Sequence, residues 1–373
     1  MTAPGWYAGL MTGTVLDGQI DLALIRTDGR EIVEFGPTGA MPYPAMLRDQ
    51  LAACVEAAAA WNFDGPEPAI TEQIERDVTM AQSDAVMAFV SSHGYGMEAI
   101  TAIGFHGQTI LHRAPADGIN GRTRQLGDGA LMAQRTGRPV IYDFRSADMR
   151  HGGQGAPLCP VYHAALLTRR QLGPEVAILN LGGIGNITWC DSDGQIIGFD
   201  TGPANAPIDD WVRRHTAGTM DQGGRLAASG IVDEAKLAQA MTHPYFHAAY
   251  PKSLDRLDFQ ASMADGMSLE DGAAFLTAFA AATVARAIEM LPGTVTRLVV
   301  CGGGRHNPVL MRFIEARAYV QVTMADDFGW RGDALEAECF AFLAARRMAD
   351  LPASFPSTTG VSQPLVAGQI AMP

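Results

Sequence analysis

The sequence predicts an α/β protein made of two related halves. Along its 373 residues, strand-length apolar runs alternate with longer stretches of helical periodicity, which is the pattern of mixed α/β domains. Two Gly-rich hairpins, at 6–25 and 176–190, each open a region of this mixed pattern. Their recurrence indicates a duplicated architecture with a cleft between the halves, although two such hairpins could also arise by chance.

Each predicted strand is a short apolar run bounded by turn residues, and each predicted helix is a longer stretch of helical periodicity. Strands are expected at 6–10, 20–25, 102–105, 139–144, 176–181, 187–190, 196–199 and 297–301. Helices are expected at 44–62, 72–93, 130–136, 157–170, 206–214, 268–291 and 333–349. Ser268 and Asp271 have capping-box spacing, and Arg346 with Arg347 places positive charge in the last turn of the final helix.

The length allows two domains, and a polar, Gly-containing stretch at 143–155 interrupts the alternating pattern. We therefore expect an N-terminal α/β domain over 1–145 and a C-terminal α/β domain over 146–360. The last residues, 361–373, are expected to pack back on the N-terminal domain.

Composition and charge narrow the class of protein. The formal net charge is −13, so the surface repels phosphate backbones and nucleic acid is not an expected partner. Five widely spaced cysteines form no CxxC pair, which is typical of reduced thiols in a cytoplasmic protein. The N-terminus lacks the basic region of a signal peptide, and the apolar stretch near 273–285 is too short to span a bilayer.

The segment GLMTGTVLDGQID, residues 9–21, is a candidate phosphate loop. Its candidate ligands are three glycines, two threonines and an aspartate: Gly9, Gly13, Gly18, Thr12, Thr14 and Asp17. Glycines let backbone N–H groups approach an anion, hydroxyls add donors, and the carboxylate could hold Mg²⁺ directly or through water. A tight hairpin with an ordinary Asp-Gly turn explains the same residues.

Two later glycine clusters are candidates for the same ligand. LNLGGIGNIT contains Gly182 and Gly183, and RLVVCGGGRHNPVLM contains three consecutive glycines, Gly302, Gly303 and Gly304, before a helix expected near 307. A strand–Gly–helix junction suits the ribose or phosphate of a nucleotide, whereas the alternatives are a plain hairpin and a compact turn. No GxxxxGK[ST] motif is present, so a nucleotide would be held without a P-loop lysine.

Three polar residues are candidates for chemistry or substrate contact. Asp200 follows an apolar strand in IIGFDTGP, where a carboxylate can face a cleft and act as a general base. His106 ends another strand and could hydrogen-bond a polar ligand, and Glu336 lies in the first turn of the last predicted helix. The structural alternatives are a turn aspartate, a buried structural histidine and an acid that complements the helix dipole.

Together these motifs resemble the anhydro-N-acetylmuramic acid kinases. The likeness covers nearly the whole chain and includes, in order, GLMTGTVLDG, GFHGQTILHR, QLGDGALMAQRTGRPV, DFRSADMRHGGQGAPLCPVYH, NLGGIGNIT, GFDTGPANAPIDDW, PKSLDRLDF, CGGGRHNPVLM and GDALEAECFAFLA. The family usually has a hydroxyl residue where Val15 stands and one residue fewer before Asp21. It also favours Thr-Gly where this chain has Leu254-Asp255.

The resemblance implies an actin-like, duplicated ribonuclease H-like fold around a central cleft, with ATP and Mg²⁺ as cofactors. It implies that water opens the ring of 1,6-anhydro-N-acetylmuramic acid while O6 takes the γ-phosphate. The product is N-acetylmuramic acid 6-phosphate, used in cell-wall recycling. Asp200 matches the general base, and Glu336 matches a sugar-contacting carboxylate. We also place His106 and Asn205 on the substrate side.

Two other hypotheses stay open from the sequence. One is a kinase or phosphatase of the same fold that acts on a different small molecule, and the other is a non-catalytic nucleotide sensor. A cleft base such as Asp200 argues against a sensor, which has no use for one. The expected partners are a small sugar and ATP, a homodimer is left open, and neither nucleic acid nor a membrane is included.

Overall fold

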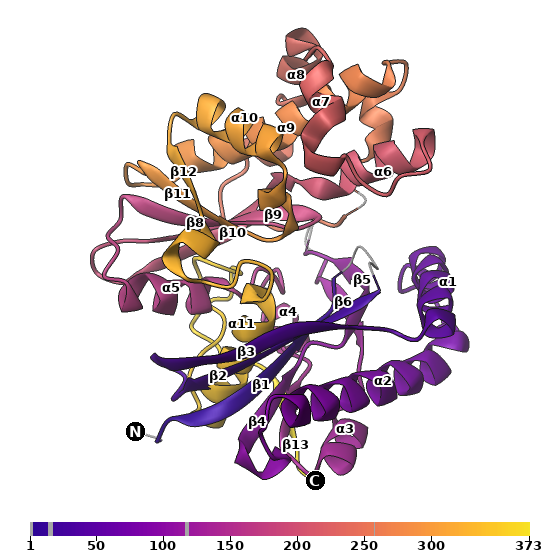
Figure 1. The fold of residues 1–373 in the computed structure, drawn as a ribbon, viewed down its shortest axis with the longest axis vertical. Coiled ribbons are helices and arrows are strands. Elements are labelled where there is room, and N and C mark those ends of the chain that lie inside the picture. Colours follow the sequence, from indigo (N-terminus) through magenta and orange to yellow (C-terminus); the bar gives the residue numbers. More distant parts are fainter. Residues whose placement is uncertain (1–2, 14–17, 116–118, 257) are drawn as a thin grey trace. The chain divides into compact units, whose positions relative to one another are not determined.

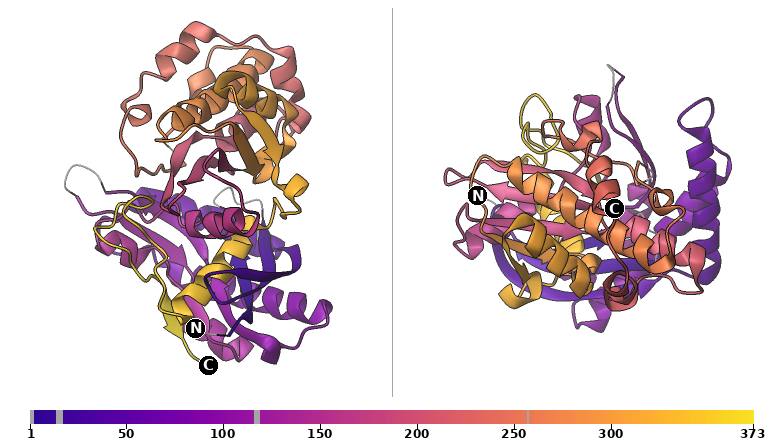
Figure 2. Two further views of the ribbon diagram at one scale, coloured as in Figure 1. Left: turned by 90° about the vertical axis from the view of Figure 1, so that its left-hand side faces the viewer. Right: turned by 90° about the horizontal axis from the view of Figure 1, so that it is seen from above.

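The computed structural model describes residues 3–13, 18–115, 119–256 and 258–373. Their contacts form two compact units, with unit 1 comprising 1–169 and 334–373 and unit 2 comprising 170–333. Both ends of the described chain lie in unit 1 (Figure 2). Thr14 and Asp17, predicted as phosphate and Mg²⁺ ligands, lie outside the described residues.

Unit 1 is built on a six-stranded mixed sheet (Figure 1). Its strands, in sheet order, are β3 (Ile32–Pro42), β2 (Gln19–Thr27), β1 (Gly5–Met11), β4 (Ile100–Phe105), β7 (Val140–Tyr142) and β13 (Gln369–Ala371). The first three strands are antiparallel, and β4 and β7 then continue parallel to β1. A separate hairpin of β5 (Gln108–Arg113) and β6 (Arg122–Leu126) follows β4.

The helices of unit 1 cover this sheet. They are α1 (Ala45–Trp61), α2 (Ile70–Ser92), α3 (Gly129–Thr136), α4 (Ser146–Arg150), α5 (Pro160–Arg169) and α11 (Leu335–Met348). Helices α1 and α2 pack their apolar residues into the same core cluster as β1, β2 and β4. Helix α11, drawn in yellow, contacts β1, β2 and β4 although more than 220 residues separate it from them (Figure 1).

Unit 2 repeats the strand order of unit 1. Its five strands, in sheet order, are β10 (Ile196–Pro203), β9 (Ile184–Cys190), β8 (Val176–Leu181), β11 (Arg297–Cys301) and β12 (Gln321–Met324). Again the first three are antiparallel, and β11 and β12 are parallel to β8. The order 3-2-1-4-5 in each unit is a duplicated topology, which confirms the predicted α/β fold class.

Unit 2 has five helices in its described part: α6 (Asn205–His215), α7 (Arg225–Ser229), α8 (Glu234–Ala240), α9 (Leu269–Glu289) and α10 (Pro308–Ala318). Helix α9 starts as predicted, because the Ser268 side chain accepts the Asp271 N–H. By length and composition α9 is the one described helix that could cross a membrane, but 78% of its apolar window is buried in the unit.

The compact units divide the chain differently from the predicted domains. The sequence placed the breaks after 145 and 360, whereas the contacts place them after 169 and 333. Helix α5 stays with unit 1 through its contacts with β3 and α11. Helix α11 belongs to unit 1 because it packs on β1, a long-range contact that no local pattern in the sequence reveals.

Candidate functional site

Three segments that were predicted separately meet in unit 2. They are the turn Gly182-Gly183, the chain that enters α6 and the turn Gly302–Gly304. The turn Gly182-Gly183 joins β8 to β9, and the chain entering α6 closes on it. The Ala204 N–H donates to the Gly183 carbonyl at 2.9 Å, and the Asn205 N–H donates to the Gly182 carbonyl at 3.0 Å. The turn after β11 lies against the same place, because a Cβ on Gly304 would come within 3.0 Å of Asn205 Oδ1.

Packing explains two of these glycines. Gly302 has a left-handed φ of 77°, and a Cβ there would lie 2.4 Å from Asn180 Oδ1. A Cβ on Gly304 would lie 2.6 Å from Leu181 Cβ. Both positions therefore need glycine for the fold itself, whether or not a ligand binds.

The other three glycines have no such internal reason. At Gly182 and Gly183 the nearest atoms to an added Cβ would be 3.5 and 3.4 Å away, and at Gly303 the nearest would be 3.9 Å away. None of the three has a left-handed φ. An alanine Cβ at each of them would make only ordinary van der Waals contacts, so packing among the described residues does not require glycine there.

Asp200 is held firmly on the neighbouring strand. Its Oδ2 accepts the Leu254 N–H at 2.9 Å, and its own N–H donates to the Lys252 carbonyl at 3.0 Å. The Tyr245 hydroxyl donates to the Asp200 carbonyl at 2.6 Å. Burial, followed by the nearby Asp200 carboxylate, raises the pKa of Tyr245, so the phenol keeps the proton that it donates.

The strand around Asp200 differs from the prediction. The sequence ended it at 199, but β10 continues to Pro203 with a register shift between Asp200 and Gly202. Asp200 is thus 6% exposed inside a strand beside a bulge. Bulges re-aim side chains, and they often lie next to active sites.

In unit 1 the first glycine of the predicted phosphate loop has a packing role instead. Gly9 lies inside β1 and pairs with Gly104 of β4. A Cβ on Gly9 would lie 1.8 Å from the Ala337 carbonyl oxygen, and one on Gly104 would lie 2.0 Å from the Phe340 carbonyl oxygen. The two glycines form the surface of the sheet against which the backbone of α11 packs, called the glycine floor below. The close approach of a helix therefore requires glycine at position 9 whether or not this residue also lies near a phosphate.

The remaining described residues of that loop make contacts within unit 1. Thr12 is buried and its hydroxyl donates to the Gly107 carbonyl at 2.7 Å, while Gln108 Nε2 donates to the Gly13 carbonyl at 3.1 Å. Gly18 has a left-handed φ of 81° and accepts the Tyr43 N–H. The bonds of Thr12 and Gly13 tie the first loop to the GFHGQT segment at 104–109, and that of Gly18 ties it to Tyr43.

Glu336 lies on α11, and His106 packs on a residue of the same helix. Glu336 lies in the first turn of α11, one helical turn before Phe340 and on the same side of the helix. The His106 ring packs on the Phe340 ring, with centroids 4.7 Å apart. Glu336 is partly exposed, whereas His106 is 4% exposed.

The environment of His106 favours a supporting position over direct substrate contact. Its Nδ1 donates to the Gly107 carbonyl at 2.9 Å, so Nε2 carries the lone pair, and Arg145 Nη2 lies 3.3 Å from it. Burial and then Arg145 lower the pKa of His106 to about 3, and the ring is neutral at neutral pH. Arg145 also donates to the Gly155 carbonyl. Sequence reasoning missed this arginine, because it read 143–155 as a domain boundary.

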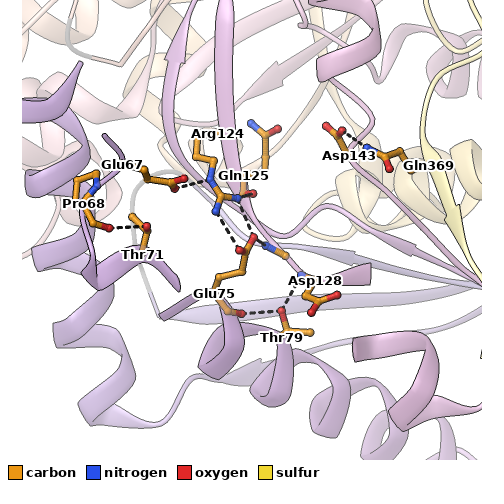
Figure 3. Close-up of polar contacts among 11 residues, drawn as sticks. Glu67, Pro68, Thr71, Glu75, Thr79, Arg124, Gln125, Asp128, Asp143 and Gln369 are labelled. Atoms are coloured by element: carbon orange, nitrogen blue, oxygen red, sulfur yellow. Dashed lines mark hydrogen bonds and ion pairs between the residues drawn. The ribbon is translucent and has the colours of Figure 1, made fainter. Parts of the chain in front are cut away.

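A cavity of about 240 Å³ in unit 1 is also lined in part by His106. Its wall includes Arg124, whose guanidinium lies between Glu67 and Glu75 (Figure 3). Burial would raise the pKa of Glu75, but Arg124 and the Gly127 N–H outweigh it and hold that pKa low. The charges of Arg124 and Glu75 are thus paired, and the other polar lining comes from Thr123, Gln125, Tyr142, Asp143 and Ser146.

Comparison with known proteins assigns the family. The family model described as "Anhydro-N-acetylmuramic acid kinase" matches residues 5–373. A protein of that name from Rhizobium rhizogenes is 57% identical over 368 residues, covering 99% of both chains, and one from Mesorhizobium japonicum is 55% identical over the same length and share.

Likeness to solved structures is much lower. A 2-hydroxyisocaproyl-CoA dehydratase activator from Clostridium difficile with bound ADPNP has 13% identity and a TM-score of 0.45, covering 92% of this chain and 97% of its own. A ROK family glucokinase from Streptomyces griseus has 15% identity and a TM-score of 0.36, covering 91% and 99%. Such values do not bear on activity. The sequence relatives and the family model do, and the chain belongs to the anhydro-N-acetylmuramic acid kinase family.

Proposed function

We propose that this chain uses ATP to convert 1,6-anhydro-N-acetylmuramic acid and water into N-acetylmuramic acid 6-phosphate and ADP, a step in cell-wall recycling. The observation that carries the proposal is in unit 2. Three glycines that the fold does not need, Gly182, Gly183 and Gly303, gather near one turn, and a rigidly held carboxylate lies on the adjoining strand. Backbone N–H groups of glycine turns suit phosphate, and the carboxylate suits a base.

In the proposed reaction Asp200 takes a proton from water as the water oxygen bonds to C1 of the sugar. The C1–O6 bond breaks, O6 bonds to the γ-phosphorus, and the bond from that phosphorus to the β-phosphate oxygen breaks to release ADP. Capture by phosphorus removes the need for O6 to leave as a free alkoxide. The protein's task is mainly alignment, which the hydrogen bonds that fix Asp200 supply.

The sugar is assigned to unit 1, with Glu336 as a contacting carboxylate and His106 as the group that supports Arg145 and Phe340. Asn205 stays a substrate-side candidate, although its backbone contacts place it beside the glycine turns. Gly9, Gly13, Gly18 and Thr12 stay phosphate-loop predictions, as do Thr14 and Asp17. A homodimer and a cytoplasmic location also stay predictions.

Mg²⁺ fits this site as an ion held largely by the nucleotide. In the part of the chain that the structure describes, no three His, Cys, Asp or Glu side chains gather into a metal cluster. Mg²⁺ commonly takes one or two carboxylates, with phosphates and water as its other ligands. Asp17 remains the predicted protein ligand, and the ion would supply neutralisation of phosphate charge.

The departure from the family motif at Leu254 does not weaken the assignment of the base. Leu254 contacts Asp200 through its backbone N–H, which any residue other than proline provides. A change of side chain there leaves this hydrogen bond in place. The choice of the anhydro sugar over a different sugar is supported instead by the relatives named anhydro-N-acetylmuramic acid kinase, which are 55–57% identical to this chain.

The test is an ATP-coupled assay with 1,6-anhydro-N-acetylmuramic acid, with the product identified by mass spectrometry. We expect Asp200→Asn to lower kcat by about 100-fold or more while ATP binding measured by calorimetry changes little. Asp193→Asn, at an exposed aspartate of unit 2, is the matched control and should retain activity. Turnover with another sugar and none with this one would reject the substrate, and full activity of Asp200→Asn would reject the base.

A further inference from the structure

We propose that Arg305 is a positioning residue for nucleotide binding, because it holds the turn Gly302–Gly304 in shape. The inference rests on the proposed function, which assigns the nucleotide to this turn. Arg305 directly follows the turn, within a 3₁₀ helix at Gly303–His306. The backbone N–H of Arg305 donates to the Gly302 carbonyl at 3.2 Å, so the backbone of Arg305 is itself bonded to the turn.

The guanidinium of Arg305 uses all five of its N–H groups. Nε donates to Asp326 at 2.7 Å, and Nη2 donates to Asp333 at 2.8 Å and to Asp326 at 3.4 Å. Nη1 donates to the other oxygen of Asp333 and, at 3.1 Å, to the Gly302 carbonyl. One side chain therefore fixes a carbonyl of the turn and two carboxylates from the 326–333 segment.

Burial shows that this is not an ordinary surface ion pair. The Arg305 side chain is 4% exposed, whereas those of Asp326 and Asp333 are 53% and 68% exposed. The hydrogen bonds that Asp333 accepts, although opposed by burial, raise the pKa of the Arg305 guanidinium. The hydrogen bonds that Arg305 donates lower the pKa of both carboxyl groups. The pairing is thus fixed in its charged form at neutral pH.

The backbone around the guanidinium is shaped to receive it. A Cβ on Gly332 would lie 2.4 Å from Arg305 Nε and 2.6 Å from its central carbon. The Gly332 carbonyl in turn accepts the Gly302 N–H at 2.9 Å. The first glycine of the turn is therefore held on both of its backbone polar groups, by Gly332 and by Arg305.

A lysine cannot replace this arrangement. Its ammonium group has three donors and no planar fork, so it could bond one carboxylate but not both together with the Gly302 carbonyl. Without the guanidinium, Asp326 and Asp333 would repel each other, and the turn would lose the bond that keeps the Gly302 carbonyl in place. Gly303 follows Gly302 directly, so its open backbone would move with it.

The test measures nucleotide and sugar dependence separately. We expect Arg305→Met to raise the KM for ATP about tenfold or more and to weaken calorimetric binding of a non-hydrolysable ATP analogue to the same extent. The KM for the sugar should stay within about twofold of the wild-type value. Arg305→Lys should recover only part of the loss. Arg317→Met, which removes an ion pair with Glu234 elsewhere in unit 2, is the matched control.

The outcomes separate this inference from the proposed function. Wild-type analogue binding by a folded Arg305→Met protein would overturn the inference, and so would equal losses for ATP and the sugar with a lowered melting temperature. Should Arg305→Met not fold, Asp326→Asn removes a single carboxylate charge and should raise the KM for ATP alone. If the wild-type protein binds the analogue but does not phosphorylate the sugar, the proposed function fails while the binding comparison still decides the role of Arg305.

Discussion

Units 1 and 2 share one strand order but use their glycines for different purposes. In unit 1, Gly9 and Gly104 lie under α11, and a side chain on either would collide with the helix backbone. In unit 2, a Cβ added at Gly182, Gly183 or Gly303 would have no neighbouring atom closer than 3.4 Å. A Gly-rich hairpin is therefore not evidence of a ligand by itself, and the space around the missing side chain distinguishes packing from binding.

The units also differ in the ionisable groups that they bury. Unit 1 contains three histidines, His106, His112 and His163, whose pKa burial lowers to about 3, 4 and 3. Unit 2 contains Asp209, whose pKa burial raises to about 6. Both kinds of shift favour the neutral form of a buried group, which leaves the histidines neutral at neutral pH but Asp209 charged, and they change stability with pH in opposite directions.

The largest expected effect is acid destabilisation of unit 1. The folded-state pKa of each of the three histidines lies below the ordinary value of 6.5. Their contribution is therefore complete above pH 6.5 and is lost as the pH falls toward 4. Each histidine should cost roughly 1.4 kcal/mol of unfolding free energy per pH unit in this range, and the three together about 4 kcal/mol per unit.

Hydrogen exchange measured by mass spectrometry at pH 7.5 and pH 5.5, corrected for intrinsic exchange rates, checks this difference. Peptides from β1, β4 and α5 should lose protection at pH 5.5 before those from β8 and β11. Equal loss of protection in the two units at pH 5.5 would contradict the claim that the buried neutral histidines make unit 1 sensitive to acid.

The next effect concerns the glycine floor of α11. Gly9→Ala places a methyl group against backbone atoms of Ala337 and Ala341, and neither strand nor helix can yield without moving the other. We expect a loss of about 3 kcal/mol in unfolding free energy. Chemical denaturation measures this loss. A denaturation midpoint of Gly9→Ala equal to that of the wild-type protein would show that α11 can move away from the strand at little cost.

Gly183→Ala is the matched control for that change. Its added Cβ would meet only the Ala206 Cβ at 3.4 Å, so the unfolding free energy should change little. The KM for ATP should rise instead, because the methyl group enters the space assigned to the nucleotide. Unchanged nucleotide binding in this variant would remove the distinction between the two units.

The local pattern of the sequence predicted elements well where each is apolar and bounded. The strands at 176–181 and 297–301 match β8 and β11 residue for residue. Strand β3 was missed, because Gly36, Pro37 and Gly39 hide its pattern at the edge of the sheet. Long-range packing was missed for a different reason, since nothing local indicates that α11 returns to β1 across the whole of unit 2.

The candidate site shows the same limit. Asp200 and the glycine turns of unit 2 could be named from sequence, because chemistry-bearing residues at strand ends form recognisable local motifs. The role of Gly9 could not, because a ligand and a helix backbone both exclude side chains. Arg305 also escaped notice, because its partners Asp326 and Asp333 are 21 and 28 residues away and only the fold brings them together.

The smallest expected effect is at Asp209, a residue of α6 in unit 2. It is half-buried, and burial raises its pKa to about 6, with Arg213 and Asp210 acting in opposite directions. A carboxyl whose folded-state pKa is raised favours folding only while protonated, so this contribution is lost as the pH rises through 6. At pH 7.5 the charged form therefore destabilises unit 2.

Asp209→Asn should raise the unfolding free energy at pH 7.5 by an amount on the order of 1 kcal/mol, because the amide resembles the neutral carboxyl and the group is partly exposed. Below pH 4 the variant and the wild-type protein should have similar stability, since both side chains are then neutral. Denaturation at the two pH values gives this difference directly. An equal gain in unfolding free energy at both pH values would mean that hydrogen bonding of the amide, and not charge burial, sets the stability at this position. The contrast in buried ionisable groups between the two units would then rest on the histidines alone.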